Sequence, residues 1–450
     1  MPKHLFNLAI PVLLANLLTT GYSVINTIWV GNIVGEVGVA AIAVSYPIMF
    51  ILMGLANGAT MATSVLVAQY FGAKDYKMVD KVVNNSLTVS SIVSVTLAVV
   101  TFLASDFLLR AMNTPGPVFA ITSSYLKLSV VGFIFIYFYF LIAAILRGIG
   151  DTVTPLAFLA ISTILNAILD PLIIIGIGPF PRLGLNGAAI ATLIAQGIAL
   201  ISALIYFNHK QHLVGFNYKK LAFEKPIIFA IFKIGLPSMV QQTLMSVGSA
   251  FVTTLVNSFG TLAIAAFGVA NRIDSIAIIL ASAIGMAVTI LTGQNIGALK
   301  YDRVRSIFKW GLIAGIGWML FFVTILMIFP KNVMYIFVKD PRVINIGISY
   351  IQMVGAAYLF VAIFFVCNGV INGAGQTIIP MIFSVISLWI IRIPFAYLFS
   401  QTELKLRGVW LSISISFMVT AIVSTIYYFT GRWKRRAIPS QTHGEIPGEH

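Results

Sequence analysis

Long windows without a charged side chain constrain this chain more than any other feature of its sequence. Residues 5–35 and 37–73 contain no Asp, Glu, Lys or Arg, and ten later windows are nearly as apolar. An apolar helix of about 20 residues crosses the hydrocarbon core of a bilayer. Only 9% of all residues are charged, whereas soluble domains carry about a quarter. We therefore predict a polytopic membrane protein.

The windows predict an all-α protein with twelve transmembrane helices. The segments are far longer than the strands of a membrane β-barrel, and they lack the alternation of apolar and polar residues that such strands show. The expected spans are 5–35, 37–73, 82–105, 119–146, 155–178, 185–207, 226–258, 260–293, 309–330, 343–371, 378–400 and 408–430.

Lys and Arg are unevenly distributed between the two sides of these spans. With the amino terminus inside, the inner segments hold 17 of the 28 Lys and Arg residues and the outer segments hold 7. Cytoplasmic connections carry the positive excess in membrane proteins. We therefore expect a plasma or inner membrane protein with both termini in the cytoplasm. The net charge of +15 then reflects orientation, and we expect no nucleic-acid partner.

Three motifs recur in the second half of the chain at a distance of 225 or 226 residues. The matching segments are 6–11 with 232–237, 69–73 with 294–298, and 148–155 with 373–380. Each copy has six predicted helices, an even number, so both copies enter the membrane in the same sense. Parallel repeats of this kind are a transporter architecture with a binding site near the bilayer midplane.

The repeat divides the chain into two pseudo-symmetric six-helix lobes. The predicted divisions are an N-terminal lobe (1–207), a Lys-rich cytoplasmic linker (208–225), a C-terminal lobe (226–430) and a cytoplasmic tail (431–450). Pro11 and Pro237 lie early in the first helix of each lobe. Proline removes one helical hydrogen bond, so each position is either a conformational hinge or a static kink.

Asp170 lies in the middle of an apolar span. A carboxylate at that depth costs at least about 2.5–3.5 kcal/mol, so it must face a polar cavity or take up a proton. Asn166 precedes it by one helical turn on the same face. Tyr22 with Asn26, and Thr192, are further polar groups at membrane depth. A carboxylate with neutral oxygens suits Na⁺ or a proton, and the alternative is a buried structural Asp–Asn pair.

Weaker candidates lie elsewhere in the spans. Arg272 and Asp274 are two residues apart, so they do not face each other on a helix, and we expect a structural or gating role for them. Gln241 and Gln242 are candidates for the wall of a cavity. Tyr139, like the methionines, could line an adaptable drug cleft, although ordinary packing explains most such residues.

The motifs of the common enzyme classes do not occur. There is no His-Glu-x-x-His, no Walker loop and no Gly-x-Ser-x-Gly in the sequence. We therefore expect a protein that is not an enzyme and has no cofactor. Without a nucleotide-binding loop, uphill transport would have to draw its energy from an ion gradient.

Taken together, the motifs resemble the multidrug and toxic compound extrusion (MATE) transporters of the bacterial and archaeal DinF-like type. The resemblance covers residues 5–430 and rests on Pro11, Asn26–Gly31, Ala68–Ala73, Arg147–Pro155, Asn166–Pro171, Leu185–Thr192 and Asn271–Asp274. It implies two bundles that form a V around a central cleft, with alternating access. It also implies a cation site formed by Tyr22, Asn26, Asn166, Asp170 and Thr192.

One residue departs from the family pattern. Position 26 is commonly aspartate in such transporters, and here it is Asn26. Asp170 then has to carry the coupling alone, and the choice between Na⁺ and H⁺ stays open.

The leading hypothesis is a monomeric secondary antiporter. It would export amphipathic, often cationic, drugs or toxic metabolites from the bilayer or cytoplasm in exchange for Na⁺ or H⁺. The alternative is a lipid-linked precursor flippase of the same superfamily. A flippase would need a strongly cationic cavity, whereas this chain has few cations within its spans. A receptor or scaffold would need neither the repeat nor Asp170.

Overall fold

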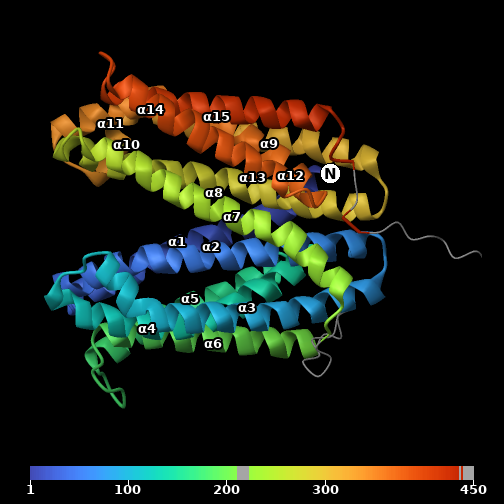
Figure 1. Cartoon of the computed structure of the whole chain (residues 1–450), viewed down its shortest axis with the longest axis horizontal. Helices are drawn as coiled ribbons and strands as arrows, with labels where there is room; N and C mark the ends of the chain where they lie inside the picture. The colour runs from blue at the N-terminus through green and yellow to red at the C-terminus, as the bar shows by residue number, and fades with distance from the viewer. Residues whose placement is uncertain (210–221, 435–436, 439–450) are drawn as a thin grey trace, which may run out of the picture.

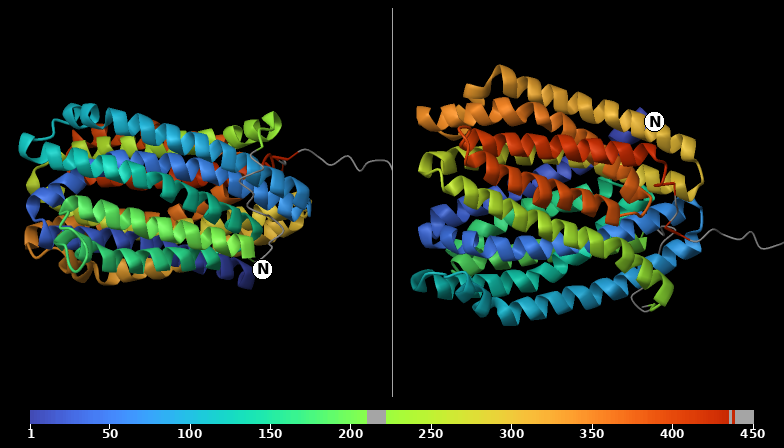
Figure 2. Two further views of the ribbon diagram at one scale, coloured as in Figure 1. Left: turned by 90° about the horizontal axis from the view of Figure 1, so that it is seen from below. Right: turned by 45° about the horizontal axis from the view of Figure 1, so that its top comes forward.

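The structure, a computed structural model, describes residues 1–209, 222–434 and 437–438. In these parts the chain forms helices joined by short loops, and twelve helical segments are long and apolar enough to cross a membrane. This confirms the predicted number of spans. Figures 1 and 2 show two bundles side by side, one from each half of the chain. We call them the N-lobe and the C-lobe.

Each span of the N-lobe is one uninterrupted helix. The helices are α1 (Pro2–Ile33), α2 (Glu36–Gly72), α3 (Tyr76–Ala111), α4 (Gly116–Ile149), α5 (Val153–Ile175) and α6 (Leu185–His209). In the C-lobe, short 3₁₀ and π segments interrupt two spans. Its elements are α7 (Lys225–Asn257), α8 (Thr261–Gly297), α9 (Tyr301–Ile328), α10 (Pro330–Phe337), α11 (Pro341–Val354), η2 (Gly355–Ala357), α12 (Tyr358–Gly373), α13 (Ile378–Val385), η3 (Ile386–Arg392), α14 (Ile393–Ser400) and α15 (Leu406–Phe429).

Successive spans alternate in direction, so the loops lie at two opposite ends of the molecule. One end carries the N-terminus and the loops that follow α2, α4, α8 and α12 (Figure 1, right). We call this end the terminal face and the opposite end the distal face.

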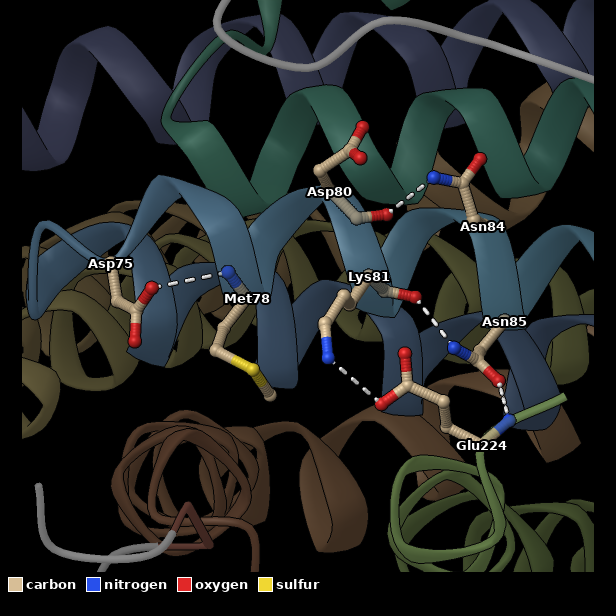
Figure 3. Close-up of polar contacts among 7 residues, drawn as sticks. All are labelled: Asp75, Met78, Asp80, Lys81, Asn84, Asn85 and Glu224. Atoms are coloured by element: carbon tan, nitrogen blue, oxygen red, sulfur yellow. Dashed lines mark hydrogen bonds and ion pairs between the residues drawn. The ribbon is translucent and has the colours of Figure 1, made fainter. Parts of the chain in front are cut away.

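Several helices extend beyond the predicted spans on the terminal face. The predicted third span begins at residue 82, but α3 begins at Tyr76. Asp75 caps this helix, because its Oδ1 accepts a hydrogen bond from the backbone nitrogen of Met78 at 3.1 Å (Figure 3). Helices continue past the apolar region, where Lys77 and Lys81 can be solvated. A charge-free window therefore marks the membrane-crossing part of a helix and not its end.

Most of the predicted linker, residues 210–221, lies outside the described residues, and so does most of the predicted tail. The end of the linker is visible at Glu224, which contacts α3 of the N-lobe (Figure 3). Its carboxylate pairs with Lys81 at 3.1 Å, and its backbone nitrogen donates to Asn85 Oδ1 at 2.7 Å. The first helix of the C-lobe thus begins on the surface of the N-lobe.

The two lobes approach each other most closely near the terminal face, at the ends of α2 and α8. A Cβ added to Gly72 would lie 1.9 Å from the carbonyl oxygen of Gln294, and one added to Gly297 would lie 1.9 Å from that of Gln69. No side chain fits at that distance, so both positions require glycine. The two contacts are related by the internal repeat.

The side chains of the same glutamines also cross between the lobes. Gln69 Nε2 donates to the carbonyl oxygen of Gly373 at 2.8 Å, and Gln294 Nε2 donates to that of Gly148 at 3.0 Å. Donors and acceptors are again equivalent positions of the repeat. We call these paired interactions, together with the two glycine contacts, the crossed Gln–Gly contact.

Toward the distal face α2 and α7 diverge, as expected for the V (Figure 1). Gly54 and Gly58 of α2 lie against α7, where an added Cβ would be 3.3 Å from Gln242 and 2.6 Å from Met239. Tyr46 and Phe50 lie on the same side of α2 as Gly54, respectively two turns and one turn nearer the distal face. They are nevertheless 58% and 44% exposed. These aromatic side chains are therefore accessible on the distal part of α2.

Pro11 and Pro237 lie inside α1 and α7. A proline leaves a carbonyl one turn earlier without its usual donor. A threonine from the loop after the fourth span bonds to the freed carbonyl in the N-lobe, and the equivalent threonine of the C-lobe bonds to the carbonyl one residue after the freed one. Thr152 Oγ1 donates to the carbonyl of Asn7 at 3.4 Å, and Thr377 Oγ1 donates to that of Ile234 at 2.7 Å. Whether either helix bends at its proline during transport stays a prediction.

The crossed Gln–Gly contact yields a first prediction. Gly297→Ala should lower the thermal unfolding midpoint of the detergent-solubilised protein, because overpacking costs about 1–3 kcal/mol. Gly317→Ala is the matched control, since an added Cβ at this α9 glycine meets no atom within 4 Å. Equal midpoints for the two variants would show that the lobes are not held together here.

Candidate functional site

Helix α5 places Asp170 and Asn166 on one face, toward the interior of the N-lobe. Asp170 is 0% exposed and Asn166 is 1% exposed. Pro171 follows inside the same helix and removes the hydrogen bond to the carbonyl of Ala167. The helix therefore presents a carboxylate, an amide and a main-chain oxygen within about one turn.

Residues of α1 and α6 complete the site. Asn26 Nδ2 donates to Asp170 Oδ2 at 3.2 Å, and the Tyr22 hydroxyl lies 2.6 Å from Thr192 Oγ1. With its amide oriented to satisfy both ends, Asn166 donates to Asp170 at 3.0 Å and accepts from Thr192 Oγ1 at 3.3 Å. All five residues of the predicted cation site therefore lie together. We call them the Asp170 cluster.

The charge of Asp170 is not neutralised by a basic side chain. Within the described parts of the chain, the four ion pairs involve other carboxylates. Both hydrogen-bond donors to Asp170 are neutral amides. A buried carboxylate surrounded by neutral oxygens and amides can bind a monovalent cation or a proton, which would supply the missing positive charge.

The carboxylate of the C-lobe has different surroundings. Asp274 accepts hydrogen bonds from the hydroxyl groups of Tyr350, at 2.7 Å to both carboxylate oxygens, and of Tyr358. Arg272 does not contact it but lies over the ring of Phe337 at 5.8 Å. The tyrosines were missed in the sequence, although their spacing of eight residues places them two helical turns apart in one span.

The remaining candidates occupy varied positions. Gln241 Nε2 donates to Ser384 Oγ at 2.6 Å, so its amide is engaged by α13 within the C-lobe. Gln242 is exposed and lies opposite Gly54. Tyr139 is a core residue, 6% exposed, whose hydroxyl donates to the carbonyl of Pro155 at 2.8 Å. Of these three, Gln242 is the one at the interface between the lobes.

Among the described residues, no three His, Cys, Asp or Glu side chains are grouped as they would be for a transition-metal site. The Asp170 cluster supplies a single carboxylate. Its ligand set therefore matches a monovalent cation better than a divalent metal, which usually takes several charged ligands.

Comparison with known proteins agrees with this architecture. The family model MatE matches residues 11–172 and 237–398, two segments separated by the distance of the internal repeat. The chain is 32% identical over 434 residues to "Probable multidrug resistance protein YpnP" of Bacillus subtilis, and the match covers 96% of each chain. It is 26% identical over 441 residues to "Probable multidrug resistance protein NorM" of Thermotoga maritima, with 97% of this chain and 94% of the relative covered.

Solved structures have the same fold. A MOP superfamily transporter from Pyrococcus furiosus superimposes with a TM-score of 0.89 at 26% identity, covering 96% of this chain and 95% of that one. A MATE structure in a bent conformation gives a TM-score of 0.90 at 26% identity with the same coverage. The resemblance inferred from the motifs is thus confirmed over nearly the whole length, and the chain belongs to the MatE family, the multidrug and toxic compound extrusion transporters.

Proposed function

We propose that this chain is a secondary antiporter that exports small amphipathic, often cationic, organic compounds in exchange for Na⁺ or H⁺. The observation that carries the proposal is the buried carboxylate of Asp170, which has only neutral hydrogen-bond donors. The names of the two relatives, both multidrug resistance proteins, support export of such compounds.

Helix α1 connects the ion site to the interface between the lobes. Asn26 lies at Asp170, whereas Leu5 and Ala9 pack in one core cluster with residues of α8 and α9. Between them, Asn16 Nδ2 donates to Ser282 Oγ of the C-lobe at 3.4 Å. A ligand shifts a conformational equilibrium by its differential affinity for the two states. A cation that replaces the amide of Asn26 at Asp170 would therefore act on α1 and, through it, on the contact between the lobes.

The central cleft is the proposed path of the organic substrate. Tyr46 and Phe50 form an exposed stacked pair there, with ring centroids 5.7 Å apart. Aromatic faces bind apolar ring systems and organic cations. The pair supports amphipathic substrates over the anionic headgroups that a lipid-linked precursor flippase would have to bind.

Orientation, membrane and oligomeric state belong to the same proposal. We place the terminal face in the cytoplasm of a cell with a plasma or inner membrane, because the inner segments carry the excess of Lys and Arg. A single chain contains both lobes and the cleft, so a monomer suffices for alternating access.

The ion-coupling proposal is tested at Asp170. Asp170→Asn keeps the shape of the side chain and removes its charge, so ion-driven efflux from proteoliposomes should fall about 5- to 150-fold, the usual range of a coupling free energy. Asp80→Asn, which changes a carboxylate near the terminal end of α3 in the same lobe, should leave efflux unchanged. If Asp170→Asn exports like the parent at several pH values and Na⁺ concentrations, the coupling site lies elsewhere, and Asp274 becomes the next candidate.

A second carboxylate can be introduced beside the first. Asn26→Asp places a carboxylate within hydrogen-bond distance of Asp170, and the added negative charge should strengthen cation binding. The half-saturating Na⁺ concentration, or the pH dependence, of efflux should therefore change while export continues. Asn26→Leu is the matched control and should weaken ion dependence. Identical ion dependence of parent and Asn26→Asp would remove α1 from the ion site.

The orientation can be tested by labelling intact cells. Cysteines at positions 217 and 440 (Asn217→Cys and Ser440→Cys), both outside the described residues, should resist membrane-impermeant thiol reagents in a background without Cys367. Thr402→Cys, in the loop between α14 and α15 at the distal face, should react. The reverse pattern would invert the proposed topology.

A further inference from the structure

We propose a second ion-binding position in the N-lobe, formed by Ser162 and Gln196, about two helical turns from Asp170 toward the terminal face. We call it the inner site. It would receive the cation after Asp170 and release it to the terminal face through the interior of the lobe. The inference rests on the proposed ion coupling and adds the route by which the ion leaves.

The pairing of α5 with α6 places these two residues opposite each other. The helices are antiparallel neighbours, and Asn166 of α5 contacts Thr192 of α6. Near their other ends Thr154 Oγ1 lies 3.3 Å from the Tyr206 hydroxyl, so the pairing persists along the whole length. Moving one turn from Asn166 toward the terminal face reaches Ser162, and the same step from Thr192 reaches Gln196.

Both side chains have a buried oxygen without a hydrogen-bond partner in the described part of the chain. These atoms are Ser162 Oγ and Gln196 Oε1, and Ser162 is 1% exposed. In the facing helix, Thr192 donates to the carbonyl of Ala188 four residues earlier at 2.9 Å. Ser162 has no such bond. Leaving a buried polar atom unpaired destabilises the folded protein, and native structures usually supply a partner.

The chemistry of the two atoms selects that partner. The amide oxygen of Gln196 can only accept, so the missing group must bring a positive charge or a hydrogen-bond donor. Na⁺ satisfies this requirement directly, and H⁺ satisfies it when carried by a bound water molecule. Because the inner site has no carboxylate, it should hold a cation more weakly than Asp170 does, as a release step requires.

The contact between α5 and α6 continues to the terminal face. Below the inner site, Phe158 is 8% exposed, and its ring packs edge-on against Tyr206 at 5.7 Å. Beyond this apolar barrier, Asp151 Oδ2 accepts a hydrogen bond from Thr154 Oγ1 at 2.6 Å. A cation leaving Asp170 would meet neutral oxygens, then an aromatic barrier, and then a second carboxylate at the surface. The ion would thus leave without entering the cleft used by the organic substrate.

The first test removes both oxygens. Ser162→Ala combined with Gln196→Leu should lower the maximal rate of ion-driven efflux by about fivefold or more, a coupling effect of ordinary size. The external ion concentration for half-maximal efflux should stay unchanged, because Asp170 is intact. Ser45→Ala is the matched control, since this hydroxyl is 1% exposed but already bonded to the carbonyl of Ala41.

The second test adds a charge. Gln196→Glu should hold the cation at the inner site, so efflux should become about tenfold more sensitive to inhibition by cation on the side of the terminal face. A merely structural role would not produce this change. Internal Na⁺ varied at fixed pH, and internal pH varied without Na⁺, distinguish Na⁺ from H⁺. Should the double variant fail to fold, Ser162→Ala and Gln196→Glu separately decide the question.

Asp170→Asn, assayed in parallel, separates two kinds of failure. If Asp170→Asn stops ion-driven efflux while the inner-site variants behave like Ser45→Ala, ion coupling stands and the inner site is wrong. If Asp170→Asn leaves efflux intact, the proposed function itself fails.

Discussion

Two close backbone contacts between α2 and α8 determine how the two lobes are arranged. Gly72 lies against the carbonyl of Gln294, and Gly297 lies against that of Gln69. A side chain at either glycine would separate α2 from α8 and break the glutamine hydrogen bonds that lie beside them. The lobes touch here, near the terminal face, and α2 and α7 diverge toward the distal face (Figure 1). The repeated Gln-x-x-Gly-Ala sequence is therefore needed twice, once for each half of a pseudo-symmetric contact.

In this arrangement α1 contacts both lobes. Its first turns pack in a core cluster with the C-lobe, and its later turns pack against α2, α5 and α6 of the N-lobe. Pro11 lies between the two regions, and the threonine hydroxyl that bonds to the carbonyl of Asn7 keeps this polar group paired. A displacement of Asn26 at Asp170 would move α1 and so be transmitted directly to the C-lobe, because the same helix contacts both lobes.

Sequence patterns predicted the spans and one half of the ion site, and physical reasons explain what they left out. Charge-free windows locate the bilayer crossings, and the spacing of Asn166 and Asp170 places both on one face of α5. Periodicity within one helix says nothing about the facing helix, so the polar pair Tyr22 and Asn26 was joined to Asp170 in one candidate site only through the family resemblance. The partners of Asp274 were missed for the same reason. Tyr139 was a candidate for the cleft but is a core residue, since the amphipathic character of a side chain does not distinguish a cleft from a packed interior.

The two lobes differ most in how they treat a buried carboxylate. Two tyrosine hydroxyls donate to Asp274. These hydroxyl donors engage both carboxylate oxygens of Asp274. Asp170 has two neutral amides instead, and such donors offset only part of the cost of a buried charge. We therefore place the proposed cation at the N-lobe carboxylate, whose donors are two neutral amides, and not at the C-lobe carboxylate, which two tyrosine hydroxyls already engage.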